Sequence, residues 1–210
     1  MPREFKSVRG ICHLKSSIFY FFPGGKGAEV EIDESKFGKR KYHKGHPVEG
    51  QWVFGGIQRK TGDCFLVAVE NRTRKTLLAI IKKYIKRETT IHSDCWKAYD
   101  VLGEEGYNHL KVNHSVNFVD PKTGCHTNTV ESMWRHAKSR LPVYNRRKKN
   151  FAGYLAKFMF LKHCKMQNKD AAVELVQAAA KYCQSTGEFE YDDKHDPDDT
   201  DDDSECEKEN

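Results

Sequence analysis

The order of apolar patterns between residues 28 and 141 limits this chain to a small set of folds. Strand-like segments lie at 29–33, 51–57, 64–69, 89–93 and within 110–119, and helical spacing recurs at 77–85, 96–102, 129–141, about 151–165 and about 169–183. The first three strands follow one another directly, and helices alternate with strands after them. Antiparallel strands followed by such an alternation predict an α/β fold, with a mixed five-stranded sheet flanked by helices.

Composition divides the chain into four segments. Residues 1–27 lack periodicity and end in the glycine-rich PGGKG, as in a leader or linker. Residues 28–165 carry the alternating elements and form the predicted domain, and residues 166–187 form a C-terminal helix. Residues 188–210 hold thirteen acidic and two basic side chains and almost no apolar ones. Because such a segment cannot offset its ordering entropy by burial, we predict a disordered acidic tail.

The rest of the chain is strongly basic. Residues 1–187 carry 34 basic and 17 acidic side chains, a net charge of +17. Lys and Arg contacts to phosphates drive nucleic-acid affinity, so this charge predicts a polyanionic partner, with a generally basic soluble surface as the alternative. The predicted contacts to a DNA backbone lie in two clusters: Lys39, Arg40, Lys41 and Lys44, then Arg146, Arg147, Lys148 and Lys149. Each cluster also fits a solvated loop or, in a eukaryotic cell, a nuclear-import signal.

The cysteines and the apolar segments indicate an intracellular protein. Seven cysteines occur without any CxxC pair, which argues against a disulfide framework and against a zinc ribbon. The apolar stretch 18–22 is short and runs into Pro23 and two glycines, so it resembles neither a membrane span nor a signal core. We therefore expect reduced thiols, no membrane partner and, in a eukaryotic cell, a nuclear location.

Three acidic residues stand at the ends or beginnings of separate predicted elements. Asp33 ends the first strand, Asp94 follows the fourth, and Glu131 opens the helix at 129–141. Carboxylates that meet at one edge of a sheet can hold the divalent ions used in phosphodiester chemistry, and Mg²⁺ prefers such oxygen ligands. Each residue also fits a structural role: Asp33 as a solvent-facing strand residue, Asp94 as a helix N-cap, and Glu131 in a capping box with Asn128. Spacing alone leaves both interpretations open.

Four blocks of sequence favour the catalytic interpretation. They are VEIDESKFGKRKYHKGHPVEGQWVFGGI, TTIHSDCWKAY, VNHSVNFVDPKTGCHTNTVESMWRHAKSRLP and GYLAKFMF. They cover roughly residues 28–162 and strongly resemble the DDE-type transposase domain of bacterial insertion sequences and their eukaryotic Merlin-like relatives, the ISXO2-like transposase domain. The resemblance implies an RNase H-like sheet whose triad of Asp33, Asp94 and Glu131 binds Mg²⁺ or Mn²⁺. It also implies a catalytic role for Lys138, the basic residue seven positions after Glu131.

Helical geometry agrees with this assignment of the helix at 129–141. Glu131, Arg135 and Lys138 share one stripe, where a metal ligand and contacts to a DNA phosphate can face one site. The alternative is an exposed ion pair along the helix, which contributes little stability. The apolar stripe beside it, suited to burial against the sheet, consists of Val130, Trp134, Ala137 and Leu141. We interpret Trp96 and Trp134 as core residues rather than as platforms for base stacking.

The family resemblance implies metal-dependent hydrolysis and transfer of DNA strands by a dimer or larger homo-oligomer on DNA. A domesticated DNA-binding protein without catalytic activity is the alternative, and the presence of all three acidic residues favours the enzyme. A nuclease acting on RNA in RNA–DNA hybrids would share the fold without being expected to show the four blocks. Such transposases usually carry a DNA-binding region ahead of the catalytic domain. Here 27 residues without helix-turn-helix or zinc spacing precede the first strand, so we do not expect them to recognise transposon ends.

Overall fold

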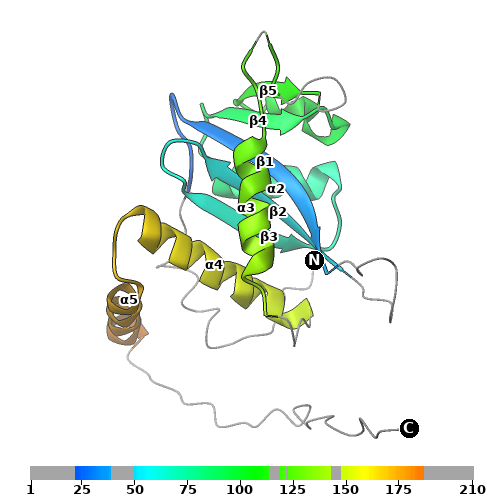
Figure 1. Ribbon diagram of the computed structural model, residues 1–210. Coiled ribbons are helices and arrows are strands. Elements are labelled where there is room, and N and C mark those ends of the chain that lie inside the picture. The colour runs from blue at the N-terminus through cyan, green and yellow to red at the C-terminus, as the bar shows by residue number, and fades with distance from the viewer. Residues whose placement is uncertain (1–21, 39–49, 114–118, 122, 143–147, 187–210) are drawn as a thin grey trace, which may run out of the picture.

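The computed structural model describes residues 22–38, 50–113, 119–121, 123–142 and 148–186. Five strands form one sheet: β1 (Glu29–Phe37), β2 (Gln51–Gln58), β3 (Cys64–Val69), β4 (Thr90–Asp94) and β5 (Asn108–Val112). Their order is β3-β2-β1-β4-β5 (Figure 1). β1, β2 and β3 pair antiparallel, whereas β4 is parallel to β1 and β5 is parallel to β4. The predicted mixed five-stranded sheet is confirmed, with the strand directions expected of an RNase H-like domain.

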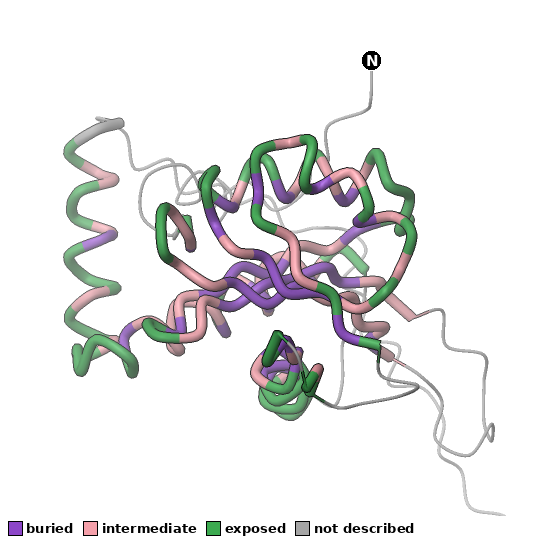
Figure 2. The backbone as a smooth tube through the Cα atoms, turned by 90° about the horizontal axis from the view of Figure 1, so that it is seen from above, coloured by how far each residue is buried: buried purple, intermediate pink, exposed green. Residues whose placement is uncertain are grey.

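Helices α2 (Arg74–Tyr84), α3 (Asn128–Ser139) and α4 (Phe151–Met166) cover the two faces of this sheet (Figures 1 and 2). The other helical segments are the 3₁₀ helix η3 (Lys97–Leu102), the 3₁₀ turn η4 (Lys148–Asn150) and α5 (Ala171–Thr186), which packs next to α4 away from the sheet. The helices predicted at 77–85, 129–141, 151–165 and 169–183 are therefore confirmed to within a few residues. The segment predicted as a helix at 96–102 forms the short 3₁₀ helix. None of the helices in the described ranges has the length and apolarity needed to cross a membrane.

Strand alternation divides the core into two parts. On one face, Val30 and Ile32 of β1 pack with the buried Leu77 and Ile81 of α2. On the other face, Phe37 packs with residues of α3 and α4. Because neighbouring strand residues point to opposite faces, Asp33 lies on the side of α3 and Glu34 on the side of α2 and η3. The two acidic neighbours therefore enter different surroundings.

Close packing beside Asp33 depends on a glycine in β2. Gly55 pairs with Asp33 across the β1–β2 ladder. A Cβ atom at Gly55 would lie 2.6 Å from Leu66 Cδ2 and 2.8 Å from Trp134 Cη2, well inside van der Waals contact. We expect Gly55→Ala to lower the free energy of unfolding in urea by about 1–3 kcal/mol through overpacking.

Gly103 provides the matched control for that substitution. A Cβ atom there would meet no atom within 4 Å, and its φ of −62° suits alanine. Gly103→Ala should therefore change the unfolding free energy by less than about 0.5 kcal/mol. Equal changes in unfolding free energy in Gly55→Ala and Gly103→Ala would mean that the β2 site is not overpacked by a Cβ atom.

Candidate active site

Asp33 and Asp94 lie on adjacent parallel strands, and Asp94 is the last residue of β4. The prediction that Asp33 ends its strand is wrong, because β1 continues to Phe37 through its pairing with β2. In the β1–β4 ladder Glu31 is level with His92, and Asp33 and Asp94 each follow two residues later. Level residues of adjacent parallel strands point to the same face, so the two side chains lie together at the edge of the sheet where β4 ends. Glu131 reaches this edge from the first turn of α3, which packs against β1 and β2. The fold thus places the three acidic residues predicted from the sequence around one edge of the sheet.

The electrostatics of Asp33 reflect these neighbours. Burial and, to a smaller extent, the negative charges of Asp94 and Glu131 raise the pKa of Asp33 to about 6. Hydrogen bonds from the Glu34 backbone N–H and from the Trp134 indole partly oppose these effects on the pKa. The Trp134 Nε1 atom donates to Asp33 Oδ2 at 2.9 Å. A half-buried carboxylate repelled by two others is a place where a cation would be bound favourably.

The donor set at this edge fits Mg²⁺ or Mn²⁺. Within the described parts of the chain, no three His, Cys, Asp or Glu side chains are grouped closely enough to enclose a metal ion. Mg²⁺ rarely uses a complete protein cage, and one or two carboxylates with waters and substrate phosphates usually complete its shell. The donors here are hard carboxylate oxygens, which suit Mg²⁺ and Mn²⁺ better than softer metals. The assignment of Asp33, Asp94 and Glu131 as ligands stays a prediction.

A buried carboxylate holds the N-terminus of α3, and sequence reasoning missed it. Glu31 is fully buried and accepts hydrogen bonds from the backbone N–H groups of Thr129, at 2.8 Å, and Val130, at 3.0 Å. The capping-box interpretation of Asn128 is wrong, because Thr127 occupies the N-cap and its side chain makes no cap hydrogen bond. Glu31 supplies those acceptors instead, and its negative charge suits the positive end of the helix dipole. It thereby fixes the turn that carries Glu131.

Arg59 neutralises this buried carboxylate and ties three segments together. Its Nε atom lies 2.8 Å from Glu31 Oε1, and its Nη1 atom lies 2.7 Å from Glu29 Oε2. Its Nη2 atom donates to the carbonyl of His126, just before α3, at 2.9 Å. The Nδ1 atom of His126 lies 3.3 Å from Glu31 Oε1 without the geometry of a hydrogen bond. The network links β1, the end of β2 and the segment that leads into α3.

Comparison with known proteins identifies the family of this domain. The profile of the ISXO2-like transposase domain matches residues 24–162. The chain belongs to this family. It is 32% identical over 81 residues to an uncharacterized transposase-like protein of Haemophilus influenzae, a match that covers 39% of this chain and 64% of that protein. The chain therefore spans less than two thirds of that relative.

Two solved structures resemble the transposase domain more distantly. The catalytic core domain of HTLV-2 integrase, in a dimeric complex with magnesium, is 12% identical with a TM-score of 0.41, and the match covers 67% of this chain and 87% of that one. A chain of the simian T-cell lymphotropic virus intasome in complex with PP2A regulatory subunit B56 gamma is 14% identical with a TM-score of 0.45. That match covers 72% of this chain and 55% of the other.

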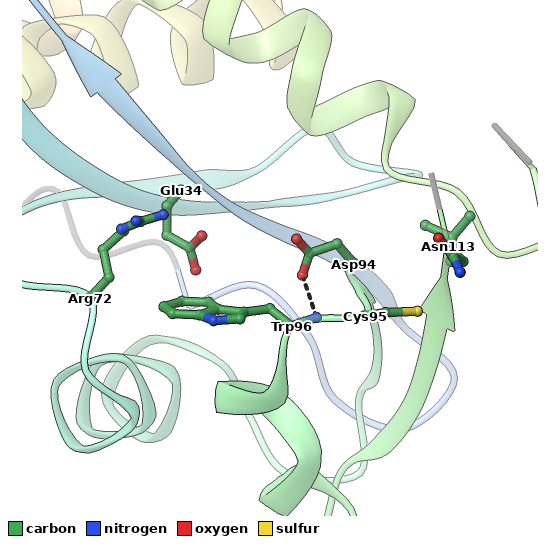
Figure 3. A pocket seen from close by; sticks show the side chains of 7 residues that line it. Glu34, Arg72, Asp94, Cys95, Trp96 and Asn113 are labelled. Carbon is green, nitrogen blue, oxygen red and sulfur yellow. Dashed lines mark hydrogen bonds between the residues drawn. The ribbon is translucent and has the colours of Figure 1, made fainter. Parts of the chain in front are cut away.

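On the other face of β1, the transposase domain has a pocket beside Asp94. The cavity holds about 390 Å³ and is lined by Glu34, Arg72, Asp94, Cys95, Trp96, Val112 and Asn113 (Figure 3). Burial and, to a smaller extent, the charges of Asp33 and Asp94 raise the pKa of Glu34 to about 7, although a hydrogen bond from Tyr99 opposes the shift. Glu34 was not among the residues predicted for the site. The available signal for Glu34 was its position directly after Asp33 in the sequence.

Asp94 has a structural role as well as a position in the site. Its Oδ1 atom accepts a hydrogen bond from the Trp96 backbone N–H at 3.1 Å, just before η3 (Figure 3). The interpretation of Asp94 as a helix N-cap is wrong, because Trp96 occupies the N-cap of η3 and the Asp94 carboxylate instead binds the N–H of that residue. This contact is compatible with metal binding, because a carboxylate offers about four lone-pair sites. Trp96 is half-buried and lines the pocket, so it is not simply a core residue. Trp134, in contrast, is buried as predicted.

The predicted DNA-contacting residues are only partly described. The exposed stripe of α3 contains Glu131, Arg135 and Lys138, while Val130, Trp134 and Ala137 are buried, and Leu141 packs against the same core. Lys138 Nζ lies 5.4 Å from the centroid of the Phe37 ring at the end of β1. Lys148 and Lys149 are exposed in η4. The remaining predicted contacts lie outside the described residues: Lys39, Arg40, Lys41, Lys44, Arg146 and Arg147.

Proposed function

We propose that this chain is the catalytic domain of a DNA transposase that hydrolyses and joins phosphodiester bonds with Mg²⁺ or Mn²⁺. The observation that carries the proposal is that Asp94 and Glu131 lie close enough to Asp33 for their charges to add to the burial that raises its pKa. Membership of the ISXO2-like transposase domain family supports the same reaction class. The protein would act inside the cell and, in a eukaryotic host, in the nucleus.

Each residue at this edge has a distinct task in the proposal. Asp33 and Asp94 hold the ions from the sheet, and Glu131 adds a carboxylate from α3. When bound there, divalent ions would supply the activation of an attacking oxygen, of water or of a DNA 3′-hydroxyl, and the stabilisation of the oxygen that leaves phosphorus. The indole of Trp134 fixes the orientation of Asp33 through its 2.9 Å hydrogen bond. Lys138 and Arg135 face DNA phosphates from the exposed stripe of α3.

The proposed partner is DNA, bound by two or more copies of the chain during strand transfer. The net charge of +17 on residues 1–187 supports a polyanionic partner. We assign backbone contacts to Lys39, Arg40, Lys41, Lys44, Arg135 and the cluster at 146–149. Such contacts position a duplex without reading its sequence.

Cleavage of duplex DNA by the purified full chain tests this function. We expect cleavage in Mg²⁺ or Mn²⁺, none in EDTA, and preference for duplex DNA over an RNA–DNA hybrid. Asp94→Asn should lower the rate by more than the roughly 100-fold typical of groups outside the metal shell, because a ligand itself is lost. DNA binding should persist in this variant.

Asp100→Asn is the matched control for that substitution. Asp100 is an exposed residue of η3 that pairs with Lys111 at 2.5 Å and is not one of the proposed metal ligands. Its loss should leave the cleavage rate unchanged. Binding of DNA without cleavage in either ion would require the catalytic proposal to be withdrawn, as would full activity of Asp94→Asn.

A further inference from the structure

A cluster of cationic and aromatic side chains lies beside the proposed metal ligands. Arg72 Cζ is 3.8 Å from the centroid of the Trp52 ring and 5.3 Å from that of Trp96. Lys36 Nζ lies 5.7 Å from the Trp52 centroid. We call Lys36, Trp52, Arg72 and Trp96 the Arg72 cluster. It spans β1, β2, the segment before α2 and the segment after β4, and it reaches the pocket through Arg72 and Trp96 (Figure 3).

Packing alone does not account for this arrangement. Both indoles border the core beneath α2 but remain half-buried, and Arg72 is exposed. In Figure 3 the carboxylate of Glu34 lies over the Trp96 ring, that of Asp94 lies beside the ring at the Trp96 backbone N–H, and Arg72 lies at the opposite end of the ring. A planar ring and a guanidinium group thus border a polar cavity. Aromatic faces combined with cations along a groove are the pattern by which proteins bind unpaired nucleic-acid strands.

The charges around the pocket determine which part of a nucleotide can enter it. Glu34 and Asp94 would repel a phosphate, whereas Glu34 can accept hydrogen bonds from the amino groups of a base. Asn113, at the far end of the lining, offers both a donor and an acceptor. Arg72 and Lys36, outside the acidic pair, can contact the backbone phosphates. The cavity of about 390 Å³ lies within the size range of small-ligand pockets, roughly 300–1,000 Å³.

We infer that the Arg72 cluster and its pocket bind unpaired nucleotides of the DNA strand next to the phosphodiester held at Asp94. The inference rests on the proposed function, because Trp96 stands two residues after Asp94 and donates its backbone N–H to that carboxylate. Bases within a duplex are stacked on their neighbours, so only an unpaired end or a displaced strand can offer a base to these rings. The ligand class is therefore single-stranded DNA joined to a duplex.

Binding of two matched DNA probes to the full chain tests this inference. The first probe is a fluorescein-labelled blunt duplex. The second is the same duplex with a single-stranded overhang, tested separately on the 3′ end and on the 5′ end. Fluorescence anisotropy is measured in EDTA, so that no strand is cut. The overhang should tighten binding by about tenfold, the contribution of one stacked base.

Substitutions assign that gain to the cluster. Trp52→Leu and Arg72→Ala should remove most of the preference for the overhang, and Trp52→Phe should keep it because it retains an aromatic face. Trp52→Leu should not alter the salt dependence of binding to the blunt duplex, since no cation is lost. The control for Arg72 is Arg74→Ala, whose Nη2 atom donates to the Lys97 carbonyl at 3.1 Å. Arg74→Ala should retain the preference.

Several results would overturn the inference. Equal affinity for the two probes would do so, and so would an equal loss of the preference in Arg72→Ala and Arg74→Ala. If neither probe binds, the proposed function fails together with the inference. If the overhang preference and its loss in the variants are observed but no ion supports cleavage, the binding site stands and only the catalytic proposal fails.

Discussion

Replacing Asp33 with asparagine should make the metal-free protein more stable while abolishing its metal-dependent cleavage. The carboxylate is held in surroundings that suit its neutral form: burial, then the charges of Asp94 and Glu131, raise its pKa from the ordinary 3.8 to about 6. Asparagine has nearly the same shape and can still accept the hydrogen bond from the Trp134 indole. It carries no charge, so the desolvation and repulsion that disfavour the Asp33 carboxylate disappear.

The pH dependence of this effect follows from the direction of the pKa shift. Because the folded-state pKa lies above the unfolded one, the contribution of Asp33 to stability is fully present below about pH 3.8 and is lost as pH rises through about 6. At pH 8 in EDTA we expect Asp33→Asn to raise the free energy of unfolding in urea by about 1–3 kcal/mol. Below pH 4 the two proteins should differ little. Asp100→Asn should not stabilise, because Lys111 lowers the pKa of Asp100.

Divalent ions should reverse the order of stability. An ion that binds only the folded state stabilises it in proportion to the logarithm of its concentration above the dissociation constant. Mg²⁺ or Mn²⁺ should therefore raise the thermal midpoint of the natural protein and leave that of Asp33→Asn nearly unchanged. If Asp33→Asn is less stable in EDTA at pH 8, the carboxylate is not the unfavourable charge that the structure indicates. An equal response of both proteins to the ions would remove Asp33 from the metal site.

The sheet and its helices were predictable because burial leaves a periodic record in the sequence. The alternation at 29–33 marks β1, and the helical spacing of Val130, Trp134 and Ala137 marks α3, since each pattern reflects one buried face. The 3₁₀ helix η3 was predicted only as a helix, because a segment of this length has too few turns to show its period. Asp33, Asp94 and Glu131 were assigned to the site through the four sequence blocks, because the spacing of the three residues alone was ambiguous.

The supporting residues of the site were not predictable because their partners come from distant parts of the chain. Glu29, Glu31, Asp33 and Glu34 form one acidic run, and the sequence does not distinguish a helix anchor from a metal ligand. Glu31 receives its hydrogen bonds from residues 98 and 99 positions away. Trp96 and Trp134 likewise look alike as aromatic residues in apolar patterns. Only the packed fold buries one against Asp33 and leaves the other on a pocket.

The other large effect expected concerns Glu31, and it falls on stability. Glu31→Ala removes the carboxylate that accepts the N–H groups of Thr129 and Val130 and pairs with Arg59. The helix terminus and the guanidinium would then stay buried without that partner. Breaking a buried ion pair from one side typically destabilises by about 3–5 kcal/mol. We expect the free energy of unfolding in urea to fall by about that amount, with α3 the first element to lose protection from hydrogen exchange.

Glu29→Ala is the control, because Glu29 binds the same arginine from a more exposed position. The side chain of Glu29 is 41% exposed, whereas that of Glu31 is fully buried. An exposed partner of this kind contributes at most about 1 kcal/mol, so Glu29→Ala should be mild. Equal losses in the two variants would mean that the charge of Arg59, and not the terminus of α3, is what Glu31 stabilises. A large loss confined to Glu31→Ala, with early exchange in α3, would mean that the helix carrying Glu131 is held in place from within the sheet.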